Sequence, residues 1–148
     1  MSDIYTSRII ELASDIHFVG PLIEVGSGPI GQSLKASKIC GSQIEVSVQL
    51  DAARQKIVSF GIVPKACALG QASAAILSHH IIGGTIDEVI AARDELRNML
   101  KHSGAAPSGR FWELRHLETV IDYPARHAST MLAWEATASA IEMALSQI

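Results

Sequence analysis

The strongest constraint on the fold lies between the chain's two cysteines, Cys40 and Cys67, where apolar residues recur with a period of two. Residues 44–50 alternate apolar and polar side chains, which is typical of a strand with one buried and one exposed face. A polar turn follows over 51–55. β-Branched and aromatic residues then predict a second strand over 56–63. The sequence therefore predicts a β-hairpin with one cysteine on each flank.

The expected register of this hairpin brings the two thiols together. If Asp51 pairs with Lys56, counting outward pairs Ile44 with Val63 and carries the first cysteine towards the second. A slip of one or two residues does not remove this convergence. A shared metal or sulfur site is therefore the leading hypothesis.

Cys67 is expected to stand at the start of a helix. Residues 68–80 are rich in alanine and leucine, and Gly83 and Gly84 end the segment. The positive field of a helix N-terminus favours a thiolate, which is the form that ligates metals. His79 and His80 lie about 18 Å away at the far end, and we interpret them as ordinary helix-end residues.

The rest of the chain is predicted to be mostly helical, with one more strand. Thr85 to Glu88 has the form of a capping box. Trp112 is expected to face inward, and Leu145 is a candidate core residue. We expect an α+β fold in one domain, residues 1–148, with a small antiparallel sheet of about three strands covered on one face by four to five helices. The further predicted elements are a strand over 33–39 and helices over 4–14, 85–101, 111–120 and 125–147.

Composition narrows the classes of function. With 12 basic and 15 acidic residues the formal net charge is −3, and no basic run occurs, so we expect no nucleic-acid partner and no anionic-membrane partner. The N-terminus does not read as a signal peptide, and no apolar run reaches the ~20 residues of a membrane helix. We expect a cytoplasmic protein with reduced thiols. Simple packing of each cysteine and a disulfide both remain open as alternatives.

No motif organises the serine, histidine and acidic residues for hydrolysis. The chain lacks a Gly-x-Ser-x-Gly elbow and a His-Glu-x-x-His sequence. We therefore do not expect an enzyme.

Three short motifs in this order resemble a known family. They are Cys40-Gly41 before the alternating strand, Ala66-Cys67-Ala68 before a small-residue helix, and Pro124-Ala125-Arg126 leading to the segment 131–136 (MLAWEA). Together they resemble the iron-sulfur cluster assembly scaffolds of the NifU N-terminal, IscU and SufU group. The long stretch between Gly83 and Pro124 is most similar to the SufU branch.

The resemblance implies a site of three cysteines and one aspartate that holds a nascent cluster, or zinc in the SufU branch. This sequence has Ser42 in place of the aspartate and Ser129 in place of the third cysteine. The asparagine-proline segment of the N-terminal loop is also replaced, by residues 17–20. A hydroxyl is a poor substitute for a thiolate or carboxylate ligand. His127, two residues before Ser129, is a candidate replacement ligand.

Two hypotheses follow. In the first, Cys40 and Cys67 bind iron, an iron-sulfur cluster or zinc, and His127, an external thiol or a second subunit completes the metal site. A cysteine desulfurase supplies sulfur, and iron-sulfur acceptor proteins are further partners. In the second, a divergent paralogue has lost the cluster and acts as a partner-binding module, with Cys67 at most accepting a persulfide.

Overall fold

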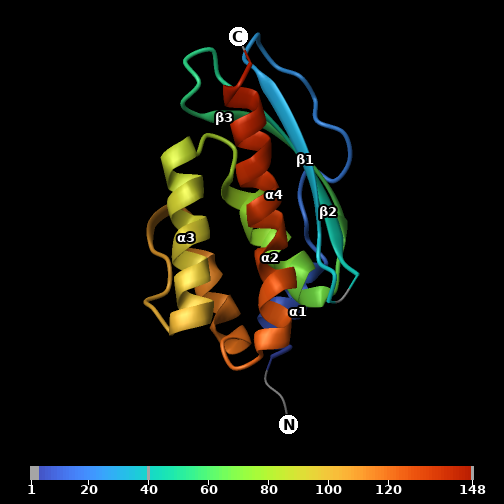
Figure 1. Ribbon diagram of the computed structural model, residues 1–148, viewed down its shortest axis with the longest axis vertical. Helices are drawn as coiled ribbons and strands as arrows, with labels where there is room; N and C mark the ends of the chain where they lie inside the picture. The colour runs from blue at the N-terminus through green and yellow to red at the C-terminus, as the bar shows by residue number, and fades with distance from the viewer. Residues whose placement is uncertain (1–3, 40, 148) are drawn as a thin grey trace.

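A computed structural model describes residues 4–39 and 41–147 (Figure 1). These residues form a three-stranded antiparallel sheet in the order β1-β2-β3, together with α-helices and 3₁₀ segments, which confirms the predicted α+β class. The elements in chain order are α1 Ser7–Ala13, β1 Ile30–Ala36, β2 Gln43–Leu50, β3 Ile57–Lys65, α2 Ala68–His80, α3 Ile86–His102, η1 Gly109–Val120, η2 Pro124–Arg126 and α4 His127–Leu145.

Helix α4 lies along one face of the sheet, against β1 and β2 (Figure 1). The approach is close enough to require glycine at position 31 of β1, because a Cβ there would lie 2.0 Å from the carbonyl oxygen of Ala140. The inward side chains of β2, Ile44, Val46 and Val48, are fully buried beneath the helices. The predicted alternation of β2 therefore marks the face on which the helices pack.

The loop between α1 and β1 covers part of the opposite face. The loop first pairs with the outer edge of β3, where Gly20 donates its backbone N–H to the carbonyl oxygen of Ile62 (2.9 Å). Further along the loop, the carbonyl oxygen of Ile23 accepts from the Ser59 hydroxyl of β3 (2.5 Å). Gln49 is fully buried. Its side-chain amide oxygen accepts from the backbone N–H of Val25, and its side-chain amide nitrogen donates to the carbonyl oxygen of Gly28, both in the same loop. This loop explains why a polar residue on the outward face of β2 is not exposed.

The hairpin of β2 and β3 has the predicted turn, in which the backbone N–H of Asp51 donates to the carbonyl oxygen of Lys56 (2.9 Å). The register beyond the turn differs by one residue, because the pairing shifts between Gln49 and Leu50. Ile44 therefore pairs with Pro64 instead of Val63. Strand β3 continues to Lys65, two residues beyond the predicted end, and leads directly to Cys67.

The predicted helices are present, with some changes at their boundaries. Helix α2 has the predicted range, and α3 begins with the complete capping box of Thr85 and Glu88. The predicted first helix starts only at Ser7, because the Thr6 side chain accepts from Ile9 and caps it there. The predicted strand 33–39 lies three residues earlier, as β1.

The inward assignments of Trp112 and Leu145 were wrong. Trp112 is 45% exposed, because η1 has a non-helical kink at Phe111 that turns the next side chain outward. Its ring instead lies beneath the Arg115 guanidinium, 5.5 Å from the ring centre. Leu145, in the last turn of α4, is 41% exposed. Helix α4 itself begins at His127, after the 3₁₀ turn η2.

Trp134 of α4 is the largest fully buried side chain, and it joins three helical segments. Its indole N–H donates to the Ser73 hydroxyl of α2 (3.1 Å), and its ring meets Phe111 of η1 edge-on at 4.9 Å. An aromatic pair of this geometry adds about 0.5–1.5 kcal/mol beyond simple burial. The hydrogen bond joins α4 to α2, and the aromatic pair joins α4 to η1. Across the described ranges, no helix combines the length and the apolar character needed to span a bilayer.

Candidate functional site

Cys67 lies at the junction between β3 and α2, as predicted. It is the N-cap residue of α2, with extended backbone angles (φ −68°, ψ 171°), and its carbonyl oxygen accepts from Gln71. Its half-buried side chain makes no capping hydrogen bond. The thiol is therefore available for another contact at the positive end of the helix dipole.

That contact is with Ser129, in the first turn of α4. The Cys67 thiol lies 3.5 Å from the Ser129 hydroxyl oxygen, to which it donates. Ser129 is buried, and its hydroxyl donates in turn to the carbonyl oxygen of Arg126 (3.2 Å). The helices approach closely here, because a Cβ on Gly70 would lie 3.1 Å from the Ser129 carbonyl oxygen. The fold thus joins two positions that are 62 residues apart in sequence.

The turn between β1 and β2 lies at the same end of the sheet. Gln43 pairs with Ala36 on one side and with Lys65 on the other. Ser42, the residue in place of the family's aspartate, is buried, and its carbonyl oxygen accepts from the backbone of Ser37 (2.8 Å). Cys40 lies outside the described residues. Its distance from Cys67 stays a prediction.

His127 is held by contacts of its own. Its Nε2 lies 3.0 Å from the carbonyl oxygen of Val120 and 3.1 Å from that of Ile121, so this nitrogen carries a proton and donates. These bonds tie the ring to the end of η1. A ligand role for Nε2 would require that both be broken, and the metal role of His127 stays a prediction.

The donor set around Cys67 is incomplete among the described residues. Within residues 4–39 and 41–147, Cys67 belongs to no group of three or more histidine, cysteine or carboxylate ligand atoms close enough to share an ion. A four-ligand metal site needs about four such donors, and a buried hydroxyl does not replace one. The thiol of Cys40 would raise the number of sulfur ligands to two.

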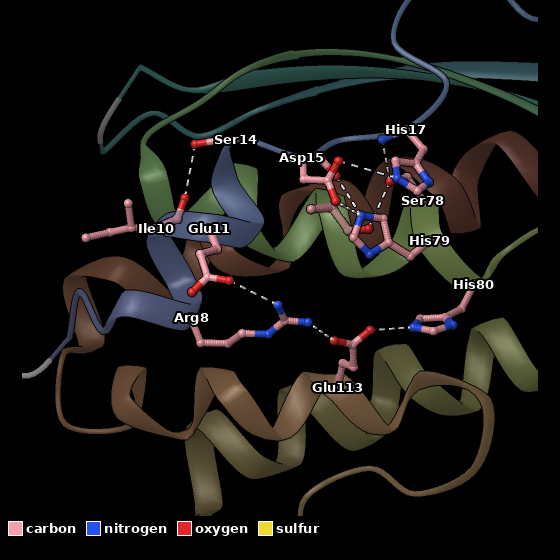
Figure 2. Close-up of polar contacts among 11 residues, drawn as sticks. Arg8, Ile10, Glu11, Ser14, Asp15, His17, Ser78, His79, His80 and Glu113 are labelled. Atoms are coloured by element: carbon pink, nitrogen blue, oxygen red, sulfur yellow. Dashed lines mark hydrogen bonds and ion pairs between the residues drawn. The ribbon is translucent and has the colours of Figure 1, made fainter.

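Sequence reasoning missed a polar network at the other end of α2. Figure 2 shows Glu113 of η1 between Arg8 of α1 and His80 of α2, with contacts of 2.5 Å and 2.6 Å. Burial opposes ionisation of the Glu113 carboxyl, but the hydrogen bonds from His80 and Arg8 outweigh it and lower its pKa below the ordinary value. Arg8 and Glu113 are 105 residues apart, so no local pattern could have predicted the pair.

His79 belongs to a second group. Its ring lies 4.1 Å from the ring of His17, centre to centre, and both imidazoles face Asp15 of the loop after α1 (Figure 2). In the sequence, the signal for this group is a pair of adjacent histidines at a helix end, and the interpretation of His79 as an ordinary helix-end residue does not include its contacts with Asp15 and His17.

Comparison with known proteins identifies the family. The chain matches the NifU-like N terminal domain over residues 4–146. The iron-sulfur cluster assembly scaffold protein IscU of Thermotoga maritima is 23% identical over 138 residues, which cover 93% of this chain and 92% of that protein. The IscU scaffold of Streptococcus pyogenes serotype M1 is 26% identical over 103 residues, covering 70% and 64%.

Comparison with solved structures agrees with this family match. The crystal structure of a nitrogen-fixing NifU-like protein (N-terminal) from Brucella abortus has a TM-score of 0.89 and 38% identity, covering 99% of this chain and 98% of that chain. A putative iron-sulfur cluster assembly scaffold protein for the SUF system from Fervidobacterium islandicum AW-1 shares the fold, with a TM-score of 0.78, 23% identity and coverage of 93% and 96%. The resemblance predicted from the cysteine motifs is thereby confirmed, and this chain belongs to the NifU-like N-terminal domain family.

Proposed function

We propose that the protein takes part in iron-sulfur cluster assembly as a scaffold-like carrier. Cys40 and Cys67 hold iron, a cluster or zinc as cargo, and a cysteine desulfurase in the cytoplasm supplies the sulfur. Membership of the family and the IscU scaffolds among its relatives support this proposal. The observation that carries it is the Cys67 thiol, which stands at the start of α2 with no capping bond and faces the first turn of α4.

The chemistry of such a site follows from its ligands. Two thiolates supply half of a tetrahedral coordination shell, and the remaining positions fall to sulfide, His127, an outside thiol or a second subunit. Since the protein fills only part of the shell, bound cargo is expected to be exchangeable. We infer a carrier that passes its cargo to acceptor proteins, with no catalytic step of its own.

Anaerobic reconstitution with iron and sulfide tests this function. We expect a visible sulfide-to-iron absorption band that is lost in Cys67→Ser and kept in the control Ser139→Ala, which changes a half-buried serine further along α4. Absence of the band from the wild-type protein, together with absence of stoichiometric zinc bound by sulfur, would contradict the proposal.

The second hypothesis, a paralogue that binds partners without a cluster, is favoured by Ser129. Its hydroxyl is buried and satisfied by Arg126, and it accepts from the Cys67 thiol, so the position is stable with no metal present. Under this alternative, the protein co-purifies with a cysteine desulfurase while X-ray absorption detects neither iron nor zinc bound by sulfur. Tight binding of a metal by sulfur would exclude it.

A further inference from the structure

A second group of metal-ligating side chains lies at the opposite end of α2 from Cys67. It consists of Asp15 and His17, in the loop after α1, and of His79, in the last turn of α2. One ligand atom from each residue lies within 4.8 Å of the other two. His79 is 12 residues from Cys67 on the same helix, about 18 Å along its axis, so the two groups cannot share an ion.

Each imidazole in this group lies close to a different oxygen of the Asp15 carboxylate. Oδ1 of Asp15 lies 3.5 Å from Nε2 of His17, and Oδ2 lies 3.4 Å from Nε2 of His79. Two ligand atoms that are each about 2.0–2.1 Å from a tetrahedral zinc ion are roughly 3.3–3.4 Å apart. For one ion to contact all three side chains, the Asp15 carboxylate must rotate and the hydrogen bond between Nε2 of His79 and the carbonyl oxygen of Asp15 (2.6 Å) must break (Figure 2).

The backbone already holds the three residues in place. The backbone N–H of His17 donates to the Ser78 hydroxyl (2.9 Å), which joins the loop to α2 directly beside His79. The backbone N–H of Asp15 donates to the carbonyl oxygen of Leu12 (3.0 Å). The carbonyl oxygen of Phe18 accepts from the backbone N–H of Ile62 in β3 (3.0 Å). Ordering a loop is a large part of the entropic cost of building a site, and here the fold has ordered it before any ion binds.

The ligand types select the class of ion. Two imidazoles and one carboxylate suit zinc and the neighbouring divalent first-row transition metals, whereas magnesium and calcium prefer oxygen ligands alone. Exposure of Asp15 (65%) and His17 (48%) leaves an open side for entry and for water ligands, while His79 is mostly buried (14%). Three protein ligands with an open position form a site from which an ion can be exchanged.

We propose that Asp15, His17 and His79 bind a divalent first-row transition-metal ion. In the metal-free protein, Nε2 of His79 carries a proton and donates a hydrogen bond to the carbonyl oxygen of Asp15, 2.6 Å away. The ion takes the place of that proton, and the imidazole stays neutral by carrying its proton on Nδ1. This proposal does not rest on the proposed function, because it uses neither cysteine and concerns the other end of α2.

A simpler explanation is an ion pair in which Asp15 balances a protonated imidazole. That arrangement would need no metal and would survive metal removal unchanged. Zinc titration of the protein separates the two explanations. The titration is done in a Cys40→Ser, Cys67→Ser background, so that sulfur ligation cannot contribute to the result.

In that background we expect one zinc ion per chain by calorimetry and elemental analysis. His79→Ala and Asp15→Asn should each weaken binding by at least about tenfold, since loss of a ligand costs at least as much as loss of a residue that supports one. His102→Ala, which removes an exposed histidine at the end of α3, should leave binding unchanged. Asp15→Asn keeps the shape of the side chain, and its circular dichroism melt, compared with that of the parent, shows whether the fold is intact.

Absence of stoichiometric zinc in the double-serine background would overturn the proposal. Binding that is unaffected by both His79→Ala and Asp15→Asn would also overturn it. Neither result bears on the cysteine site, because that site is absent from the protein tested.

Discussion

Replacing Ser129 with cysteine tests whether the position beside Cys67 is a ligand position. The Ser129 hydroxyl oxygen lies 3.5 Å from the Cys67 sulfur. Two sulfur ligands that are each about 2.3 Å from a tetrahedral zinc ion are roughly 3.8 Å apart. A sulfur atom at position 129 would therefore lie close to the required separation without movement of α2 or α4.

The expected gain in affinity can be worked from this geometry. Four-ligand zinc sites have apparent binding free energies of about 10–16 kcal/mol, or roughly 2.5–4 kcal/mol per ligand. One added thiolate should thus tighten binding on the order of 10²–10³-fold. The metal-free protein loses the hydrogen bond from Ser129 to Arg126, which costs about 0.5–1.5 kcal/mol of folding stability.

Titration with cobalt measures this effect selectively, because thiolate-to-cobalt charge-transfer absorption reports sulfur ligands and ignores imidazole sites. Competition with zinc then gives the zinc affinity at the same ligands. The matched control is Ser139→Cys, which adds a thiol to the same helix about 15 Å away. Equal affinities for Ser129→Cys, Ser139→Cys and the wild type would refute the assignment of position 129 to the metal site.

Two further predictions concern stability. Glu113→Gln should cost about 1–3 kcal/mol of unfolding free energy in urea titrations, because the carboxylate is buried (7% exposed) and accepts from Arg8 and His80. Since folding lowers the pKa of Glu113, the stability that its carboxylate contributes is complete above the unfolded pKa of 4.5 and is lost as the pH falls below that value. The difference in unfolding free energy between Glu113→Gln and the wild type should therefore shrink in acid. A difference that stays constant with pH would contradict this. Gly31→Ala should cost about 3 kcal/mol or more in thermal melts, because the new Cβ meets the backbone of Ala140, and an unchanged melting temperature would contradict the close packing of β1 on α4.

The sequence predicted the elements whose signals are local. The alternation in β2, the capping box of α3 and the composition of α2 each describe one segment, and the structure confirms all three. The position of Cys67 at a helix start follows from the same local signals. Its approach to Ser129 did not follow from them, and was implied only by resemblance to a family.

The sequence predictions that were wrong have physical causes that the sequence of one helix or strand does not encode. The register changed by one residue because of an irregularity at Gln49, which the covering loop holds by its side chain. Trp112 turned outward at a kink that helical periodicity does not describe. The contacts of His79 and His80 join segments that are 64 and 33 residues apart, so only the tertiary structure reveals them.

X-ray absorption at the iron edge, after anaerobic loading with ferrous iron and no added sulfide, shows whether Cys67 holds the cargo of this protein. We expect sulfur neighbours of the iron at about 2.3 Å, as in other metal–thiolate bonds, supplied by the protein alone. This sulfur signal should weaken in Cys67→Ser, which keeps only the thiol of Cys40, and should be unchanged in Ser139→Ala. Iron surrounded only by nitrogen and oxygen in the wild-type protein would contradict the claim.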